Sequence, residues 1–214
     1  MSRGRLLTLG VALAGLGVAV GWFAGLLVHG DGHEQHEAQE PAAADIGFSQ
    51  DMVVHHEQAV EMARIVQGRV EGRVGVLAAS ILEVQTREVG IMRGWLDLWG
   101  ASQVAGEPMA WMDGEHAGHG EESSGDAPMP GLASVSEMQS LDDLTGEELE
   151  VQFLQLMLRH HEGGIEMAEH GSRMASVDAV SALARSMSVE QQQESELIVQ
   201  LLAERGADPE LDPS

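Results

Sequence analysis

Residues 51–63 read DMVVHHEQAVEMA, and residues 156–168 read LMLRHHEGGIEMA. A shift of 105 residues places the two stretches in register at His-His-Glu and at Glu-Met-Ala, and it also aligns Phe48 with Phe153. So many coincidences within a short window indicate an internal repeat. The repeat therefore sets the architecture of the chain.

Apolar residues recur every three or four positions around each copy of the repeat, which predicts amphipathic helices. We expect helices over about 49–66, 76–99, 145–171 and 178–205, with Gly100 and Gly206 as stop signals. Thr145 and Glu148 have the spacing of a capping box, and Asp178 is expected to cap the last helix. A short helical turn is expected near 136–140.

The second helix of each half also repeats, with one further residue of slip. Gln85 then aligns with Gln191 and Glu88 with Glu194. Each half is therefore predicted to be a helical hairpin, and the two hairpins are expected to pair about a pseudo-twofold axis. The predicted fold is an all-α, ferritin-like four-helix bundle over 45–206, with repeats at 45–100 and 145–206, an irregular linker at 101–144 and an acidic tail at 207–214.

The N-terminal segment carries a membrane signal. Residues 6–28 contain no charge and follow Arg3 and Arg5. A helix of that length spans roughly 34 Å, enough for a bilayer core of about 30 Å. We expect a transmembrane anchor over 1–29, followed by a flexible stalk at 30–44; a cleaved signal peptide is the alternative. Either reading places the C-terminal domain outside the cytoplasmic membrane.

Composition limits the available chemistry. The chain has 214 residues, no Cys, 35 acidic and 11 basic residues, and a net charge of −24. Without Cys there are no disulfides and no thiolate metal sites. The negative charge disfavours nucleic acid as a partner and favours cations. Any bound metal ion must therefore be held by His, Met, Asp or Glu.

A helical wheel divides the repeat into a buried and an exposed face. His55 falls at the centre of the apolar face, between Met52 and Met62, and His160 is placed equivalently. His56 and His161 fall at the edge of that face. We predict that His55 and His160 face each other, and that the motif glutamates point to solvent: Glu57, Glu61, Glu162 and Glu166.

Two readings of the inward histidines are open. They are either core residues, hydrogen-bonded to Gln85, Glu88, Gln191 or Glu194, or ligands of a metal ion. Thioether and imidazole donors without thiolate suit Cu(I) or Cu(II). The candidate ligands are His55, His56, Met52, Met62, His160, His161, Met157 and Met167. Met62 and Met167 lie ten residues, or about 15 Å, along the helices from Met52 and Met157. All four thioethers therefore cannot bind one ion, and Met52 and Met157 are expected to be the first ligands.

The loops add further potential ligands. His29, His33 and His36 lie in the stalk, and the linker contains His116 and His119 together with Met109, Trp111, Met112 and Met129. Short His- and Met-rich tracts are typical of metal capture, although a solvated linker has the same composition.

Two alternatives belong to other functional classes. One is a metal-free structural or interaction module whose acidic surface meets a cationic partner. The other is a ferritin-like di-iron oxidase that uses Glu88 and Glu194, although the repeats lack the Glu-x-x-His pairs of that class. No nucleophile triad, phosphate loop or dinucleotide fingerprint is present, so we expect no enzyme activity.

These motifs resemble a known family. The repeats at 51–63 and 156–171, the segment ILEVQTREVGIMRGWLDLWG at 81–100 and Met-Pro-Gly at 129–131 are similar to the bacterial domain of unknown function 305 family. The resemblance implies a ferritin-like fold and a secreted or membrane-anchored location. Some similar proteins, of the CopM type, bind copper in the periplasm and aid copper tolerance. Carried over to this chain, this implies the same eight His and Met ligands.

Overall fold

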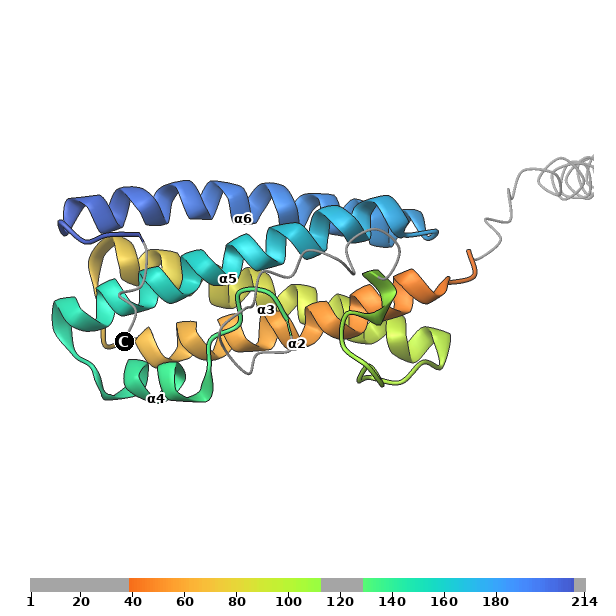
Figure 1. The fold of residues 1–214 in the computed structure, drawn as a ribbon, viewed down its shortest axis with the longest axis horizontal. Helices are drawn as coiled ribbons and strands as arrows, with labels where there is room; N and C mark the ends of the chain where they lie inside the picture. The colour runs from red at the N-terminus through yellow and green to blue at the C-terminus, as the bar shows by residue number, and fades with distance from the viewer. Residues whose placement is uncertain (1–38, 113–128, 210–214) are drawn as a thin grey trace, which may run out of the picture. The chain divides into compact units, whose positions relative to one another are not determined.

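The computed structural model describes residues 39–112 and 129–209, and within these ranges all regular structure is helical (Figure 1). This confirms the predicted all-α class. The helices are α2 (Ala43–Val66), α3 (Gly72–Trp99), α4 (Val135–Asp143), α5 (Gly146–Met174) and α6 (Asp178–Glu204), with a 3₁₀ turn η1 (Ala110–Met112).

The four long helices form two hairpins. Helix α2 packs along α3, and α5 packs along α6, as α5 and α6 show in Figure 1. The hairpins meet mainly through α2 and α5. These two helices run antiparallel, because Gly171 at the end of α5 lies against the ring of Phe48 near the start of α2, whereas Gly164 lies against His55. Helices α2 and α5 therefore cross the middle of the domain.

Helix ends differ in detail from the predictions. Helix α2 begins at Ala43, which the sequence placed in the stalk, and α3 begins at Gly72 rather than near 76. Thr145 is the N-cap of α5, but its side chain makes no capping hydrogen bond, and Asp178 follows the N-cap residue of α6 instead of being it. The capping box is found in α4, where Ser134 and Glu137 bond each other's backbone amides.

Asp45 explains why α2 starts early. Its carboxylate accepts hydrogen bonds from the amides of Ala42, Ser176 and Val177 and from the Ser176 hydroxyl. Burial alone raises the pKa of Asp45, but these donors outweigh burial and hold the pKa below its usual value. The carboxylate thus joins the first turn of α2 to the turn between α5 and α6.

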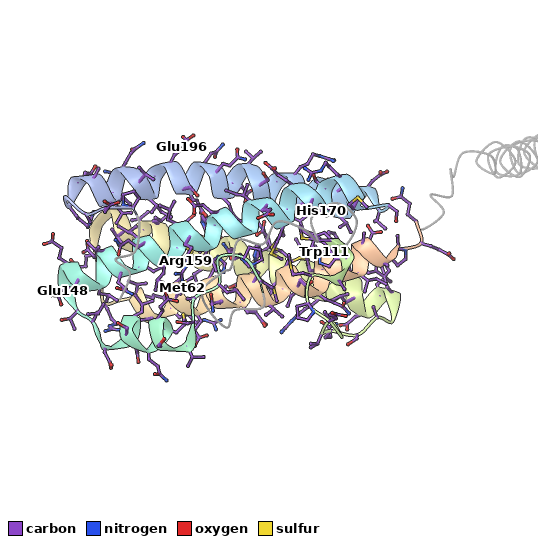
Figure 2. The ribbon with its side chains drawn as sticks, in the orientation of Figure 1. Met62, Trp111, Glu148, Arg159, His170 and Glu196 are labelled. Atoms are coloured by element: carbon purple, nitrogen blue, oxygen red, sulfur yellow. The ribbon has the colours of Figure 1, made fainter. Side chains whose placement is uncertain are left out.

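The core consists of two clusters. The aliphatic cluster surrounds Phe153 and contains Val74, Leu77, Ile81, Leu141, Leu149, Leu154, Leu156, Ile198, Leu201 and Leu202 together with Met62 and Met157. The methionine cluster surrounds Phe48 and contains Met52, Val53, Val89, Met92, Met129, Met167, Ala168, Val180, Ala184 and Met187. Figure 2 labels Met62 in one half of the domain, and Trp111 and His170 in the other. The buried histidines lie between the clusters.

Several predicted segments lie outside the described residues: the apolar run at 6–28, the histidines of the stalk, His116 and His119, and the end of the tail. Among the helices of the described ranges, none has the length and apolarity needed to cross a membrane.

Candidate metal centre

The antiparallel crossing of α2 and α5 brings four histidines into the centre of the domain. His55, His56, His160 and His161 have no exposed surface. The rings of His55 and His160 lie with their centroids 3.9 Å apart and their planes inclined by 37°. The prediction that these two side chains face inward and toward each other is confirmed.

The two facing histidines bind backbone carbonyls. His55 Nε2 lies 3.1 Å from the carbonyl oxygen of Pro130, and His160 Nε2 lies 2.9 Å from the carbonyl oxygen of His55. A carbonyl oxygen can only accept, so each Nε2 carries the proton. The suggestion that these two rings bond Gln85, Glu88, Gln191 or Glu194 is wrong, because both acceptors are backbone carbonyl oxygens, which no side-chain pattern marks.

Glycines let the linker reach this position. A Cβ atom at Gly163 would lie 2.2 Å from the Pro130 carbonyl oxygen, and one at Gly131 would lie 2.4 Å from the carbonyl oxygen of Arg159. Gly131 also has φ +76°, a conformation that favours glycine. The Met-Pro-Gly segment therefore lies directly on α5 and presents the Pro130 carbonyl to His55.

The two outer histidines bind carboxylates from the second helix of their own hairpin. His56 Nε2 lies 2.9 Å from Glu88 Oε2, and His161 Nε2 lies 2.7 Å from Glu194 Oε2. Glu88 is 3% exposed. Each hairpin thus contains one His–Glu pair, so the internal repeat of the sequence extends to the contacts between side chains.

All four imidazoles therefore use Nε2 in a hydrogen bond, and in all four Nδ1 is buried without a hydrogen-bond partner. In a neutral ring with its proton on Nε2, as in His55 and His160, Nδ1 has a free lone pair. A histidine that binds a metal through one nitrogen commonly donates its other N–H to a carboxylate or carbonyl, which fixes the ring and its tautomer. The four rings have this arrangement of donors and acceptors.

The facing rings are uncharged at neutral pH. Burial lowers the pKa of His55 to about 3; neighbouring His56 and His161 lower it further, whereas the bond to Pro130 acts in the opposite direction. Burial also lowers the pKa of His160 well below its usual value, and the other three imidazoles add to this effect. Neutral imidazole is the form that binds metal ions.

Two glutamines complete the polar centre. Gln85 and Gln191 are buried, and Gln85 Oε1 and both polar side-chain atoms of Gln191 have no hydrogen-bond partner. A Cβ at Gly164 would lie 2.3 Å from Gln191 Oε1 and 3.1 Å from His55 Cε1, so a side chain there would displace the Gln191 amide. Each unpaired buried polar group costs roughly 1–3 kcal/mol. The centre therefore contains more polar atoms than the protein itself satisfies.

The methionine candidates divide differently from the prediction. Met52 and Met167 belong to the methionine cluster, whereas Met62 and Met157 belong to the aliphatic cluster. Met52 and Met157, the two methionines expected to bind first, therefore lie in different clusters, because antiparallel helices place the start of α2 beside the end of α5. Each pair lies on its own side of the histidines.

Part of the linker covers the methionine cluster. Trp111 packs edge-on against Phe48, with ring centroids 5.6 Å apart, and its indole nitrogen donates to Asp51. Met109 and Met112 pack on the same cluster and are partly exposed. Trp111, which stands between Met109 and Met112 in the sequence, therefore packs on the methionine cluster.

The site as described is a set of donors and not an assembled coordination sphere. Among the residues of 39–112 and 129–209, no three His, Asp or Glu side chains are arranged so as to hold one metal ion. The stacking of His55 on His160 directs the rings at each other. The motif glutamates Glu57, Glu61, Glu162 and Glu166 are exposed, as predicted.

Three contributors to this centre were missed by the sequence reasoning: Pro130, Gly163 and the linker contact of Asp51. The Met-Pro-Gly segment was noted, but only as part of a resemblance. Gly163 and Gly164 are adjacent glycines within the continuous helix α5. Such a pair is the sequence signal that could have indicated a close approach of another segment's backbone to the helix.

Three comparisons place the chain among known proteins. A protein from Streptomyces coelicolor, described as a presumed secreted protein of the DUF305 group, has 41% identity, a TM-score of 0.70, and coverage of 80% of this chain and 98% of its own. A DUF305 fragment from Deinococcus radiodurans has 32% identity, a TM-score of 0.60, and coverage of 77% and 98%. CopM in its Cu(I)-bound form has 19% identity, a TM-score of 0.56, and coverage of 75% and 96%.

No curated protein sequence matches the chain. The likeness to CopM shows a shared fold. The family model described as "Domain of unknown function (DUF305)" matches residues 45–202, which include both His-His-Glu repeats and the linker. The chain therefore belongs to the DUF305 family.

Proposed function

We propose that this protein binds copper outside the cytoplasmic membrane and holds it without catalysing a reaction. The N-terminal segment at 6–28 would anchor the domain to the membrane, or direct its secretion if cleaved. Support for the location comes from the charge pattern of that segment and from the relative described as a presumed secreted protein.

One observation carries the proposal: four buried imidazoles each bond an oxygen acceptor through Nε2 and leave Nδ1 without a hydrogen-bond partner. Imidazole nitrogen is a donor of the type that copper accepts in either oxidation state. His55, His56, His160 and His161 would supply nitrogen, and Met52, Met62, Met157 and Met167 would supply sulfur. CopM, which shares the fold, has been solved with Cu(I), Cu(II) and silver.

Copper would have to change the centre in order to bind there. No three His, Asp or Glu side chains of the described residues surround one position, so the imidazoles would have to move. The carbonyl and carboxylate partners of Nε2 would limit that movement.

The second candidate is the metal-free module. It is favoured by the lack of a three-ligand group among the described residues and by the hydrogen bonds that already hold each ring. In this reading the centre fixes the pairing of the two hairpins. The di-iron alternative would require Glu88 and Glu194 as ligands, but each of these carboxylates is already bonded to a histidine.

The test is a copper titration of the full chain purified in detergent, beside the double variant His55→Asn/His160→Asn. The matched control is Glu61→Gln/Glu166→Gln, which alters the same motif at exposed positions. We expect tight binding of copper by the wild type and the control, and a large loss in the histidine variant with its circular dichroism retained. Equal binding by all three proteins would contradict the proposal, as would absence of binding by the wild type.

A further inference from the structure

The two core clusters lie on opposite sides of the histidines and are related by the repeat, yet they differ in chemistry. A shift of 106 residues aligns Ile81 with Met187 and Met92 with Ile198. All four side chains are buried, with exposed fractions of at most 1%. Where the aliphatic cluster has two isoleucines, the methionine cluster therefore has two methionines.

Hydrogen bonds fix the level of these residues along the helices. His56 on α2 bonds Glu88 on the antiparallel helix α3. Met52 lies one turn before His56, and Met92 lies one turn after Glu88, so these two methionines lie at the same level. His161 on α5 bonds Glu194 on α6, and about two turns away lie Met167 and Met187.

The contacts between α2 and α5 join the two pairs. Gly171 meets Phe48 and Gly164 meets His55, so Met167 lies opposite Met52. The four methionines share one cluster and have exposed fractions of 0%, 0%, 0% and 1%. One methionine from each long helix thus reaches a single level of the bundle, which we call the methionine layer: Met52, Met92, Met167 and Met187.

We infer that the methionine layer is a binding site for a soft monovalent cation, Cu(I), distinct from the imidazole centre. The inference rests on the proposed function and extends it to two residues, Met92 and Met187, that no repeat motif contains. Four uncharged thioethers suit a soft ion with little affinity for water, and they are poor ligands for Zn²⁺ or Mg²⁺.

Charge and access fit a cation at this level. Glu88, 3% exposed, lies one turn from Met92, and Asp51, 1% exposed, precedes Met52. These acidic groups can offset a buried positive charge, which is costly when unpaired. Met109 and Met112 are partly exposed on the outer side of the same cluster, beside Trp111. They place two further thioethers between solvent and the buried part of the cluster.

The repeat itself supplies a substitution for the test. Met92→Ile/Met187→Ile gives the methionine layer the composition of the related level in the aliphatic cluster, where Ile81 and Ile198 are already packed. The matched control is Met138→Ile, which removes a methionine that packs on the aliphatic cluster and is not among the proposed ligands. If the first variant does not fold, Met92→Leu/Met187→Leu provides the same loss of sulfur with an unbranched Cβ.

The experiment is an anaerobic competition titration of the full chain in detergent with Cu(I), with Ag(I) as a redox-silent probe. Sulfur ligation is read by X-ray absorption, and the methionine methyl groups by ¹³C NMR. We expect the layer variant to lose at least about tenfold in Cu(I) affinity and to show a smaller sulfur contribution, from Met52 and Met167 alone, while the control keeps the wild-type affinity and sulfur contribution. Methyl resonances of the four layer residues should shift with Ag(I) in the wild type.

Two results would overturn the inference. One is equal Cu(I) affinity and sulfur ligation in wild type and layer variant, and the other is an equal loss in the control. If Cu(II) still binds through nitrogen in either case, the proposed function stands and the methionine layer alone fails. If the wild type binds neither oxidation state of copper, both fail.

Discussion

His160 donates a hydrogen bond from Nε2 to the backbone carbonyl oxygen of His55, 2.9 Å away, and the rings of the same two residues lie with their centroids 3.9 Å apart and their planes tilted by 37°. Two residues at equivalent positions of a repeat are therefore coupled through both a side chain and a main chain. Because that carbonyl oxygen belongs to α2 itself, a displacement of α2 relative to α5 changes the position of the His160 ring. The candidate centre is therefore part of the interface between the two hairpins.

The first prediction concerns acid stability. The pKa of His55 is about 3 in the folded protein against 6.5 for an ordinary histidine, and that of His160 is also lowered. Above pH 6.5 both residues are neutral in the folded and unfolded chains, and they contribute no pH dependence. Below it the unfolded chain takes up protons that the folded chain does not, so stability falls by about 1 kcal/mol per pH unit for each histidine.

This slope can be measured by urea unfolding at pH 7, 6 and 5. The imidazoles of His56 and His161 act electrostatically on both rings. The control is the double variant His55→Asn/His160→Asn, whose slope over this range should be smaller. A wild-type stability that stays constant from pH 7 to 5 would contradict the prediction.

The second prediction is that Gly164→Ala destabilises the domain by about 1–3 kcal/mol, because its Cβ would overlap Gln191 Oε1 and press on His55. Gly94→Ala is the control. A Cβ at Gly94 meets no atom within 4 Å, and glycine in an exposed helix is less stable than alanine by up to about 1 kcal/mol. Chemical denaturation should show opposite signs for the two changes, and a shared sign would be evidence against the close approach.

The third prediction tests whether the glutamate partners orient the outer histidines for copper binding or serve the fold alone. Glu88→Gln/Glu194→Gln removes the charge from both partners of the outer histidines while leaving an oxygen acceptor. If the imidazoles bind copper, affinity should fall by roughly 10–100-fold, since such partners orient the ring and raise its basicity. The measurement is a Cu(II) titration beside Glu61→Gln/Glu166→Gln. An unchanged affinity would indicate that the His–Glu pairs serve the fold alone.

The fourth prediction concerns Asp45. Asp45→Asn should destabilise the domain by about 1–3 kcal/mol, because an amide cannot accept all four hydrogen bonds from Ala42, Ser176 and Val177. The pKa of Asp45 is lowered, so its contribution is present above the ordinary aspartate pKa of 3.8 and is lost as the pH falls through the folded value. Asp143→Asn, at an exposed position, is the control in a thermal unfolding assay.

The sequence predicted the helical repeat well because periodicity depends on the helices alone. The inward direction of His55 and His160 and the outward direction of Glu57 and Glu162 follow from 3.6 residues per turn, and the structure confirms both. The His–Glu pairs were within reach as well, since the repeat aligned Glu88 with Glu194, although they were assigned to the wrong histidines of each motif.

What the sequence could not predict is the relation between segments. The pairing of Met52 with Met167 instead of Met157 depends on the direction in which α2 crosses α5, and that direction has no signature within either helix. The Pro130 carbonyl is a backbone atom of an irregular linker, so no side-chain pattern marks it. The methionine cluster draws its thioethers from all four long helices, so its composition depends on how α3 and α6 pack beside α2 and α5.

The position of Pro130 has a consequence for how the two halves are related. Two separate copies of a hairpin, paired about an exact twofold axis, would give both central imidazoles the same surroundings. Here one ring is bonded to the linker and the other to the neighbouring helix. Joining the halves in one polypeptide thus makes two chemically identical side chains inequivalent, and it lets each copy of a duplicated motif diverge under its own selective pressure.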